Sequence, residues 1–322
     1  MAVRRREFLG IVGSAAAWPV VALAQKPNRI GLLNAGGASP TIDALIASLA
    51  ELGYVEGKNT IIERRFAEGK VDQLRALATG LVNLPVDVIV TVGTPAAFAA
   101  KQATTTIPIV FAGNSDPVGV GLVASLARPG GNTTGNSLMS PDLSAKRLEI
   151  LKTAAPQISR IAILWDSSNP GMAQRVRETE IAADQAHILL RTVGPRTLDE
   201  LEAAFGELAK LRPDALLVTT EPFTRMHQGR ILDFANSNRL PAMYEDATFV
   251  EAGGLMSYGP DYRALFRRAA VLVDKIIKGA KAGDIPIEQP TTFDLVINLK
   301  TANTIGLDVP PALLMRANKV IE

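Results

Sequence analysis

A capping residue followed by proline recurs where predicted strands end. The instances are Ser39-Pro40, Thr94-Pro95, Asn169-Pro170 and Glu221-Pro222. Ser, Thr and Asn side chains accept hydrogen bonds from the free amides of a helix's first turn, and proline fits the first helical position. In parallel sheets such N-termini gather on one edge, where free amides and the helix dipole favour an anion. The pattern predicts a carboxylate-binding edge, although plain capping without a ligand would explain any single instance.

Acidic residues on the same edge are candidates to hold an ammonium group. Asp116, Glu221 and Asp246 each follow a predicted strand. An ammonium needs one or two carboxylates that face the anion site. The competing interpretation of Asp116 is that it initiates a turn. With their neighbours, these features give the predicted ligand-binding set: Ser39, Thr94, Asn114, Asp116, Ser168, Asn169, Glu221 and Asp246.

Motifs for catalysis fail on inspection. Residues 119–124 have the spacing of a dinucleotide fingerprint, but they lie mid-chain without a ribose-binding acid at the required distance. No Gly-x-Ser-x-Gly sequence exists, and the chain has no cysteine, which excludes thiolate catalysis and disulfides. His187 and His227 have no metal-ligand spacing to other residues. The sequence predicts a protein that is not an enzyme and has no metal or cofactor.

The elements that must position these residues alternate between short apolar strands and helices. Predicted strands span residues 29–35, 60–66, 86–92, 108–112 and 133–138, and then 160–165, 188–193, 215–220 and 241–244. Predicted helices span residues 41–52, 73–83, 96–101, 143–154, 173–186, 198–211 and 262–278. This alternation is typical of parallel sheets covered by helices on both faces. We expect an α/β protein with two similar doubly wound lobes joined by a hinge.

The 322 residues are too many for one ordinary core and suit two lobes. We place lobe 1 at residues 28–138 and 257–285, and lobe 2 at residues 139–256 and 286–322. Glycine-rich or proline-containing stretches near each joint mark the predicted crossings. Several crossings between two lobes would form a hinge.

Residues 1–24 resemble a signal peptide of the twin-arginine type. Arg5 and Arg6 precede an apolar stretch, and the small-x-small sequence Ala22-Leu23-Ala24 predicts cleavage before Gln25. The alternative is an uncleaved anchor, but the stretch is shorter than the roughly 20 residues that span a bilayer. We expect a periplasmic mature protein.

Charge argues against nucleic acid as a partner. Residues 1–24 hold three of the 34 basic residues and one of the 32 acidic residues, so the remainder carries 31 of each. Phosphate binding needs a surplus of Lys and Arg on one face.

The last quarter of the chain carries a family resemblance. Residues 249–260 read FVEAGGLMSYGP, followed by FRRAA at 266–270, IPIEQP at 285–290 and VINLKTA at 296–302. These blocks, with GTPAA at 93–97 and DPVG at 116–119, resemble the ABC-transporter substrate-binding protein family whose characterised relatives bind tryptophan or phenylalanine.

The resemblance implies a type I periplasmic-binding fold with three crossovers, in which the lobes close on a ligand. It assigns the ligand carboxylate to Thr94 and Ser39, and an ammonium to Asp246 and Glu221. The expected function is a monomeric periplasmic receptor that delivers a small carboxylate-bearing solute to an ABC permease in the inner membrane. An amino acid is one candidate solute, and another small carboxylate or an amide stays open. A sensor subunit for a membrane receptor and a periplasmic enzyme are the alternative functions.

Overall fold

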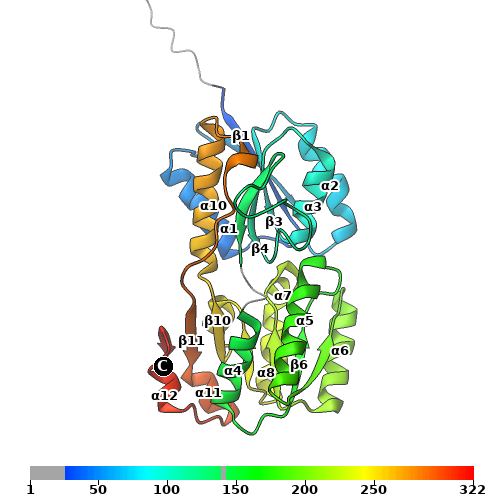
Figure 1. Ribbon diagram of the computed structural model, residues 1–322, viewed down its shortest axis with the longest axis vertical. Helices are drawn as coiled ribbons and strands as arrows, with labels where there is room; N and C mark the ends of the chain where they lie inside the picture. The colour runs from blue at the N-terminus through cyan, green and yellow to red at the C-terminus, as the bar shows by residue number, and fades with distance from the viewer. Residues whose placement is uncertain (1–25, 139–142) are drawn as a thin grey trace, which may run out of the picture.

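The computed structural model describes residues 26–138 and 143–322, which form two α/β lobes placed end to end (Figure 1). The predicted signal peptide, residues 1–24, lies outside the described residues. Among the helices of the described chain, none combines the length and apolar character that a bilayer span requires.

Lobe 1 contains a five-stranded parallel sheet in the order β2-β1-β3-β4-β5. Its strands are β1 (Asn28–Asn34), β2 (Thr60–Phe66), β3 (Val88–Val92), β4 (Ile109–Asn114) and β5 (Thr133–Ser137). Its helices are α1 (Pro40–Glu51), α2 (Leu74–Val82), α3 (Thr94–Ala103) and α10 (Tyr262–Ile277), with short 3-10 turns at Val71–Gln73 and Ala282–Asp284. Ile30 and Leu32 pack under α1 and α10, while Leu33 packs under α2 and α3, so the sheet is buried on both faces.

Lobe 2 contains a seven-stranded sheet in the order β12-β11-β10-β9-β8-β6-β7, in which only the β10–β11 pair is antiparallel. Its strands are β6 (Arg160–Leu164), β7 (Leu189–Val193), β8 (Ala215–Val218), β9 (Ala242–Tyr244), β10 (Met256–Gly259), β11 (Asp294–Asn298) and β12 (Lys319–Ile321). Its helices are α4 (Ser144–Ala154), α5 (Pro170–Gln185), α6 (Leu198–Leu211), α7 (Pro222–Met226), α8 (Gln228–Ser237), α9 (Ala247–Glu251), α11 (Leu299–Ile305) and α12 (Pro311–Leu314).

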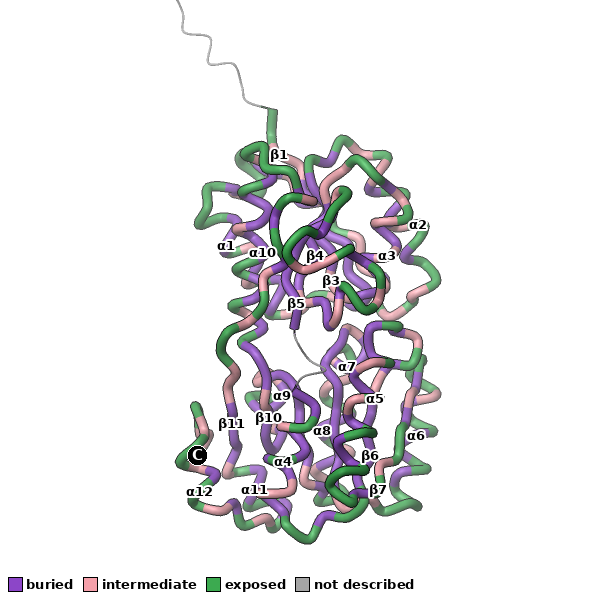
Figure 2. Tube along the Cα trace, viewed as in Figure 1, coloured by how far each residue is buried: buried purple, intermediate pink, exposed green. Residues whose placement is uncertain are grey.

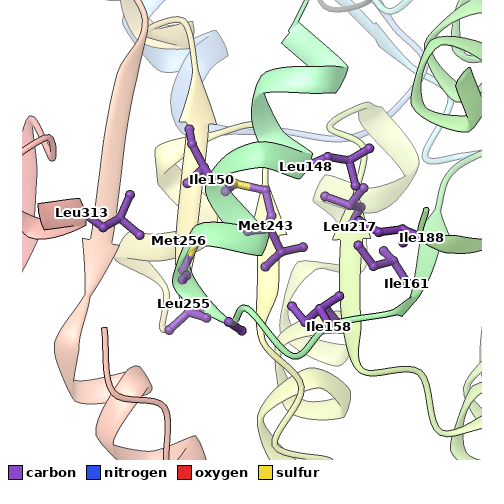
Figure 3. Packing of buried hydrophobic residues seen from close by; sticks show 14 of the residues in the cluster. Leu148, Ile150, Ile158, Ile161, Ile188, Leu217, Met243, Leu255, Met256 and Leu313 are labelled. Atoms are coloured by element: carbon purple, nitrogen blue, oxygen red, sulfur yellow. The ribbon is translucent and has the colours of Figure 1, made fainter. Parts of the chain in front are cut away.

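Each face of the second sheet has its own apolar core. Leu148 and Ile150 of α4 pack against Leu217, Met243 and Met256 of the strands (Figure 3). The opposite face packs against α6, α8 and α9. In both lobes the central strands are buried, whereas the outer helix faces and the edge strands β7 and β12 are largely in contact with solvent (Figure 2). These cores fix the ends of the strands, and therefore the residues that follow them.

The predicted fold class is confirmed, but two predicted boundaries need correction. β10 pairs with β9 and β11, so residues 256–259 belong to lobe 2 and the chain crosses after Gly259, not before Ser257. The amides of Ile287 and Glu288 donate to carbonyls of Leu126 and Gly135 in lobe 1, so the return crossing follows Glu288. Both crossings lie a few residues later than expected. The backbone hydrogen bonds of each lobe continue past the glycine- and proline-containing stretches that were used to place the boundaries.

Candidate functional site

A cavity of about 270 Å³ lies between the lobes. Lobe 1 contributes the loop after β1, the start of α3, the end of β4 and the first turn of α10. Lobe 2 contributes the start of α5, the segment after β8 and parts of α7–α9. The carboxyl ends of strands from both sheets therefore converge on one space, as parallel α/β folds predict. Its size, just below the roughly 300–1,000 Å³ typical of ligand pockets, suits a small metabolite.

The lobes touch around this cavity. Arg175 of α5 donates a hydrogen bond from Nη2 to the hydroxyl of Ser115 in lobe 1. A Cβ placed on Gly171 would lie 2.5 Å from Oγ1 of Thr94, and one on Gly93 would lie 2.9 Å from Cγ of Pro222. The absence of a side chain at these glycines allows the close approach. The structure therefore represents a closed arrangement.

Ser39 and Asn169 line the cavity while capping their own helices. Oγ of Ser39 accepts from the amide of Ile42 at 3.4 Å, and Oδ1 of Asn169 accepts from the amide of Gly171 at 3.1 Å. Part of their hydrogen-bonding capacity is thus used locally, as the capping interpretation predicted.

The N-terminus of α3 differs from those of α1 and α5. Its N-cap is Gly93, which has φ of 88° and no side chain to cap the helix. Thr94 is the first helical residue, is 2% exposed and lines the cavity. This first turn receives no side-chain cap, and Gly93 and Thr94 line the cavity, so the start of α3 can accept an anion there.

Glu221 supplies the acidic group of the cavity. Its Oε1 accepts from the amide of Asp166 at 2.7 Å and from the hydroxyl of Thr219 at 2.8 Å. Its Oε2 has a 3.5 Å contact with Nδ2 of Asn169, and the Glu221 side chain also forms a capping box with Thr224 at the start of α7. Burial, and after it the charge of Asp166, raises the pKa of the Glu221 carboxyl to about 8. This carboxyl is consequently poised to ionise when a cation arrives.

Four predicted residues do not line this cavity. Oδ1 of Asp116 accepts from the amide of Gly119, so Asp116 forms the turn that was the competing interpretation. Ser168 donates its hydroxyl to Asp166. Asn114 is buried beside the lining residue Gly113, and its side chain makes no hydrogen bond within the described chain. Asp246 caps α9 and forms an ion pair with Arg225, so Arg225 stands where the sequence analysis expected the Asp246 carboxylate.

Arg225 and Tyr262 are site residues that the sequence analysis missed. Nη1 of Arg225 pairs with Asp246, and its guanidinium carbon lies 4.6 Å from the ring centroid of Tyr262, which reaches across from lobe 1. Both residues line the cavity. The available signal was the spacing of Glu221 and Arg225, which are four residues apart and would lie on one side of a helix.

Unpartnered buried polar atoms gather on this cavity. Nη2 of Arg225, the hydroxyl of Tyr262 and the hydroxyl of Thr220 are buried and make no hydrogen bond within residues 26–138 and 143–322. Folded proteins satisfy nearly all buried polar groups, so a cluster of unsatisfied ones marks a place for a polar ligand or water. Apolar side chains of Leu138, Met172, Met226 and Phe266 complete the wall. In the described residues no cluster of His, Cys, Asp and Glu has the arrangement of a metal site.

Residues 32–321 match the family described as ABC transporter substrate binding protein. The chain belongs to this family. The family predicted from the motif blocks is therefore confirmed, together with the periplasmic-binding-protein fold.

Several proteins similar to this chain are described as binding amino acids or other substrates. The chain is 29% identical over 273 residues to a tyrosine-binding protein of Clostridioides difficile strain R20291, covering 83% of this chain and 78% of that one. It is 28% identical to an ABC domain from Streptococcus pneumonia solved in complex with L-Trp, with a TM-score of 0.84, and the match covers 92% of this chain and all of that chain. A ligand-free, open substrate binding protein from Clostridium difficile gives 26% identity and a TM-score of 0.62, with 91% and 99% covered.

Proposed function

We propose that this protein is the solute-binding receptor of an ABC import system and captures an amino acid with an aromatic side chain in the cavity between its lobes. The observation that carries the proposal is the cluster of unpartnered buried polar atoms on a cavity that both lobes line. Relatives that bind tyrosine and L-Trp, and the apolar wall around Phe266, support an aromatic amino acid as the solute.

The lobes take complementary roles in this proposal. In lobe 1, the uncapped start of α3 with Thr94, assisted by Ser39, receives the solute's carboxylate. In lobe 2, Glu221 and Asn169 receive its ammonium. A solute that contacts both lobes stabilises the closed form relative to open ones, which is how binding would signal to a transporter.

The proposed location is the periplasm, and the proposed partner is an ABC permease of the inner membrane. Family membership and the signal-like composition of residues 1–24 support both. We propose that the protein acts as a monomer, because one chain supplies both walls of the cavity. That it catalyses no reaction stays a prediction, consistent with relatives described as binding proteins.

A thermal-shift screen tests this function. The chain starting at Gln25 is heated with a panel of amino acids, small organic acids and amides. A true ligand at one hundred times its dissociation constant should add about 2.7 kcal/mol of stability, which shifts the midpoint by several degrees. Stabilisation by tyrosine, tryptophan or phenylalanine is expected. A well-folded protein that no member of the panel stabilises would contradict the proposal.

A further inference from the structure

The charged residues that line the cavity, among those the structure describes, are one acid and one base. They are Glu221 and Arg225, four residues apart, with Glu221 preceding α7 and Arg225 within it. Residues at this spacing lie on one side of a helix and usually pair when their charges are opposite. Here they do not pair with each other: Arg225 pairs with Asp246, and Glu221 accepts from Asp166 and Thr219. Each keeps capacity that faces the cavity.

Arg225 is held as a fixed donor. Asp246 engages Nη1, the Tyr262 ring covers one face of the guanidinium, and only 19% of the side chain is exposed. Its Nη2 is buried without an acceptor in the described chain. A guanidinium cannot shed its proton, so this donor needs an acceptor from elsewhere. A planar guanidinium whose Nη1 is held by Asp246 presents Nη2 in a fixed direction, which suits a carboxylate oxygen as acceptor.

We propose that Arg225 binds the solute's carboxylate, while Glu221, one helical turn earlier, binds the ammonium beside it. Asp246 and Tyr262 are positioning residues that aim the guanidinium. The inference rests on the proposed function, because it needs a carboxylate-bearing solute in the cavity. One carboxylate oxygen then meets Arg225 in lobe 2, and the other meets the first turn of α3 in lobe 1.

This arrangement ties recognition of the carboxylate to closure. Arg225 and Asp246 belong to lobe 2, whereas Tyr262 opens α10 in lobe 1. The guanidinium is therefore covered by the ring only when the lobes meet. A cation over an aromatic face is attracted to it, and the attraction strengthens when water is excluded. In an open form Arg225 would be exposed to solvent, and the Tyr262 ring would no longer orient its guanidinium.

The test measures discrimination between an acid and its amide. Dissociation constants of L-tyrosine, L-tryptophan and their amides are measured by calorimetry at pH 6.5, where both forms carry an ammonium. The proteins are the wild type, Arg225→Gln, Arg225→Lys and the control Arg230→Gln. Arg230 lies on α8 of the same lobe and forms an exposed pair with Glu202 away from the cavity.

The wild type and Arg230→Gln should bind the acid at least about 30-fold more tightly than the amide. In Arg225→Gln this ratio should fall toward one, because the acid loses its charged partner while the amide loses little. Arg225→Lys, which keeps the charge but not the fork, should preserve the preference for the acid at lower affinity.

Equal weakening of acid and amide by Arg225→Gln would overturn the inference, since it would mean that Arg225 only supports the wall. A wild type that binds acid and amide alike would overturn it too, while leaving the solute-binding function intact. If the wild type binds no member of the thermal-shift panel, both the proposed function and the assignment of Arg225 to the carboxylate are wrong.

Discussion

Two buried glutamates follow neighbouring strands of lobe 2 and have opposite surroundings. Glu245 follows β9, and Glu221 comes after β8; each is 4% exposed. Glu245 accepts from Nη1 of Arg147 at 2.9 Å, from Arg175, and from the amide of Thr220 at 2.8 Å. Glu221 has no ion pair with a described residue, and it lines the cavity.

The difference shows which buried carboxyl serves structure and which serves binding. Arg147 and Arg175 form ion pairs with Glu245, and these pairs connect α4 and α5 to the end of β9. The Glu245 carboxylate therefore has its countercharges within lobe 2. Glu221 lacks such a partner, and its pKa of about 8 records what burial costs the ionised form. A protein retains such a group when a ligand supplies the missing charge, at a cost in stability of the free form.

The largest expected effect is on stability, from Glu245→Gln. This substitution leaves Arg147 and Arg175 buried without their countercharge, which should destabilise the ligand-free protein by about 3–5 kcal/mol. Urea denaturation followed by circular dichroism measures the change. A loss of unfolding free energy below about 1 kcal/mol would mean that the ion pairs of Glu245 with Arg147 and Arg175 do not stabilise the lobe.

Glu221→Gln should act in the opposite direction. Between pH 4.5 and about 8 the unfolded chain releases the Glu221 proton and the folded chain retains it, so stability of the wild type falls as pH rises through this window. Glutamine has no charge to bury. The free energy of unfolding of the variant should exceed that of the wild type by about 2 kcal/mol at pH 9, and the two should differ little at pH 4.

Urea midpoints of ligand-free protein at pH 4, 7 and 9 measure this difference. Arg230→Gln, an exposed change, should stay within about 0.5 kcal/mol at each pH. A Glu221→Gln variant that is less stable than the wild type at pH 9 would show that the carboxylate is ionised and stabilising in the free protein.

A smaller effect is expected from Gly171→Ala, which leaves both glutamates in place. The new methyl group would meet Oγ1 of Thr94 at 2.5 Å across the closed cleft. Closure should therefore be incomplete, and solute affinity should fall about 10-fold, the equivalent of roughly 1.4 kcal/mol. Stability without ligand should not fall, because alanine suits a helix better than glycine. Calorimetry and urea denaturation separate the two outcomes, and unchanged affinity would contradict the closed geometry.

The sequence predicted the fold well because the alternation of strands and helices is local and strong. It missed β10, β11 and β12 as strands, since the regular alternation of strand and helix within one lobe stops there: the chain leaves lobe 2 after β10 and returns to form β11 antiparallel to it. Of the eight predicted site residues, Ser39, Thr94, Asn169 and Glu221 line the cavity between the lobes, and their role in binding stays a prediction. Which side chains face that cavity depends on turn geometry and on the opposite lobe, and neither can be read from spacing. Asp246 and Arg225 illustrate this, because their mutual ion pair decides which of them meets the solute.

The most direct test of the account compares solute affinity in the wild type, Glu221→Gln and Arg230→Gln by calorimetry at pH 7.5. The probe is the amino acid that most stabilises the wild type in the thermal-shift screen. We predict at least about 30-fold weaker binding by Glu221→Gln, because the solute's ammonium loses its buried countercharge, and wild-type affinity in Arg230→Gln. Equal affinity in all three proteins would contradict the assignment of Glu221, and with it the cavity between the lobes as the site of capture.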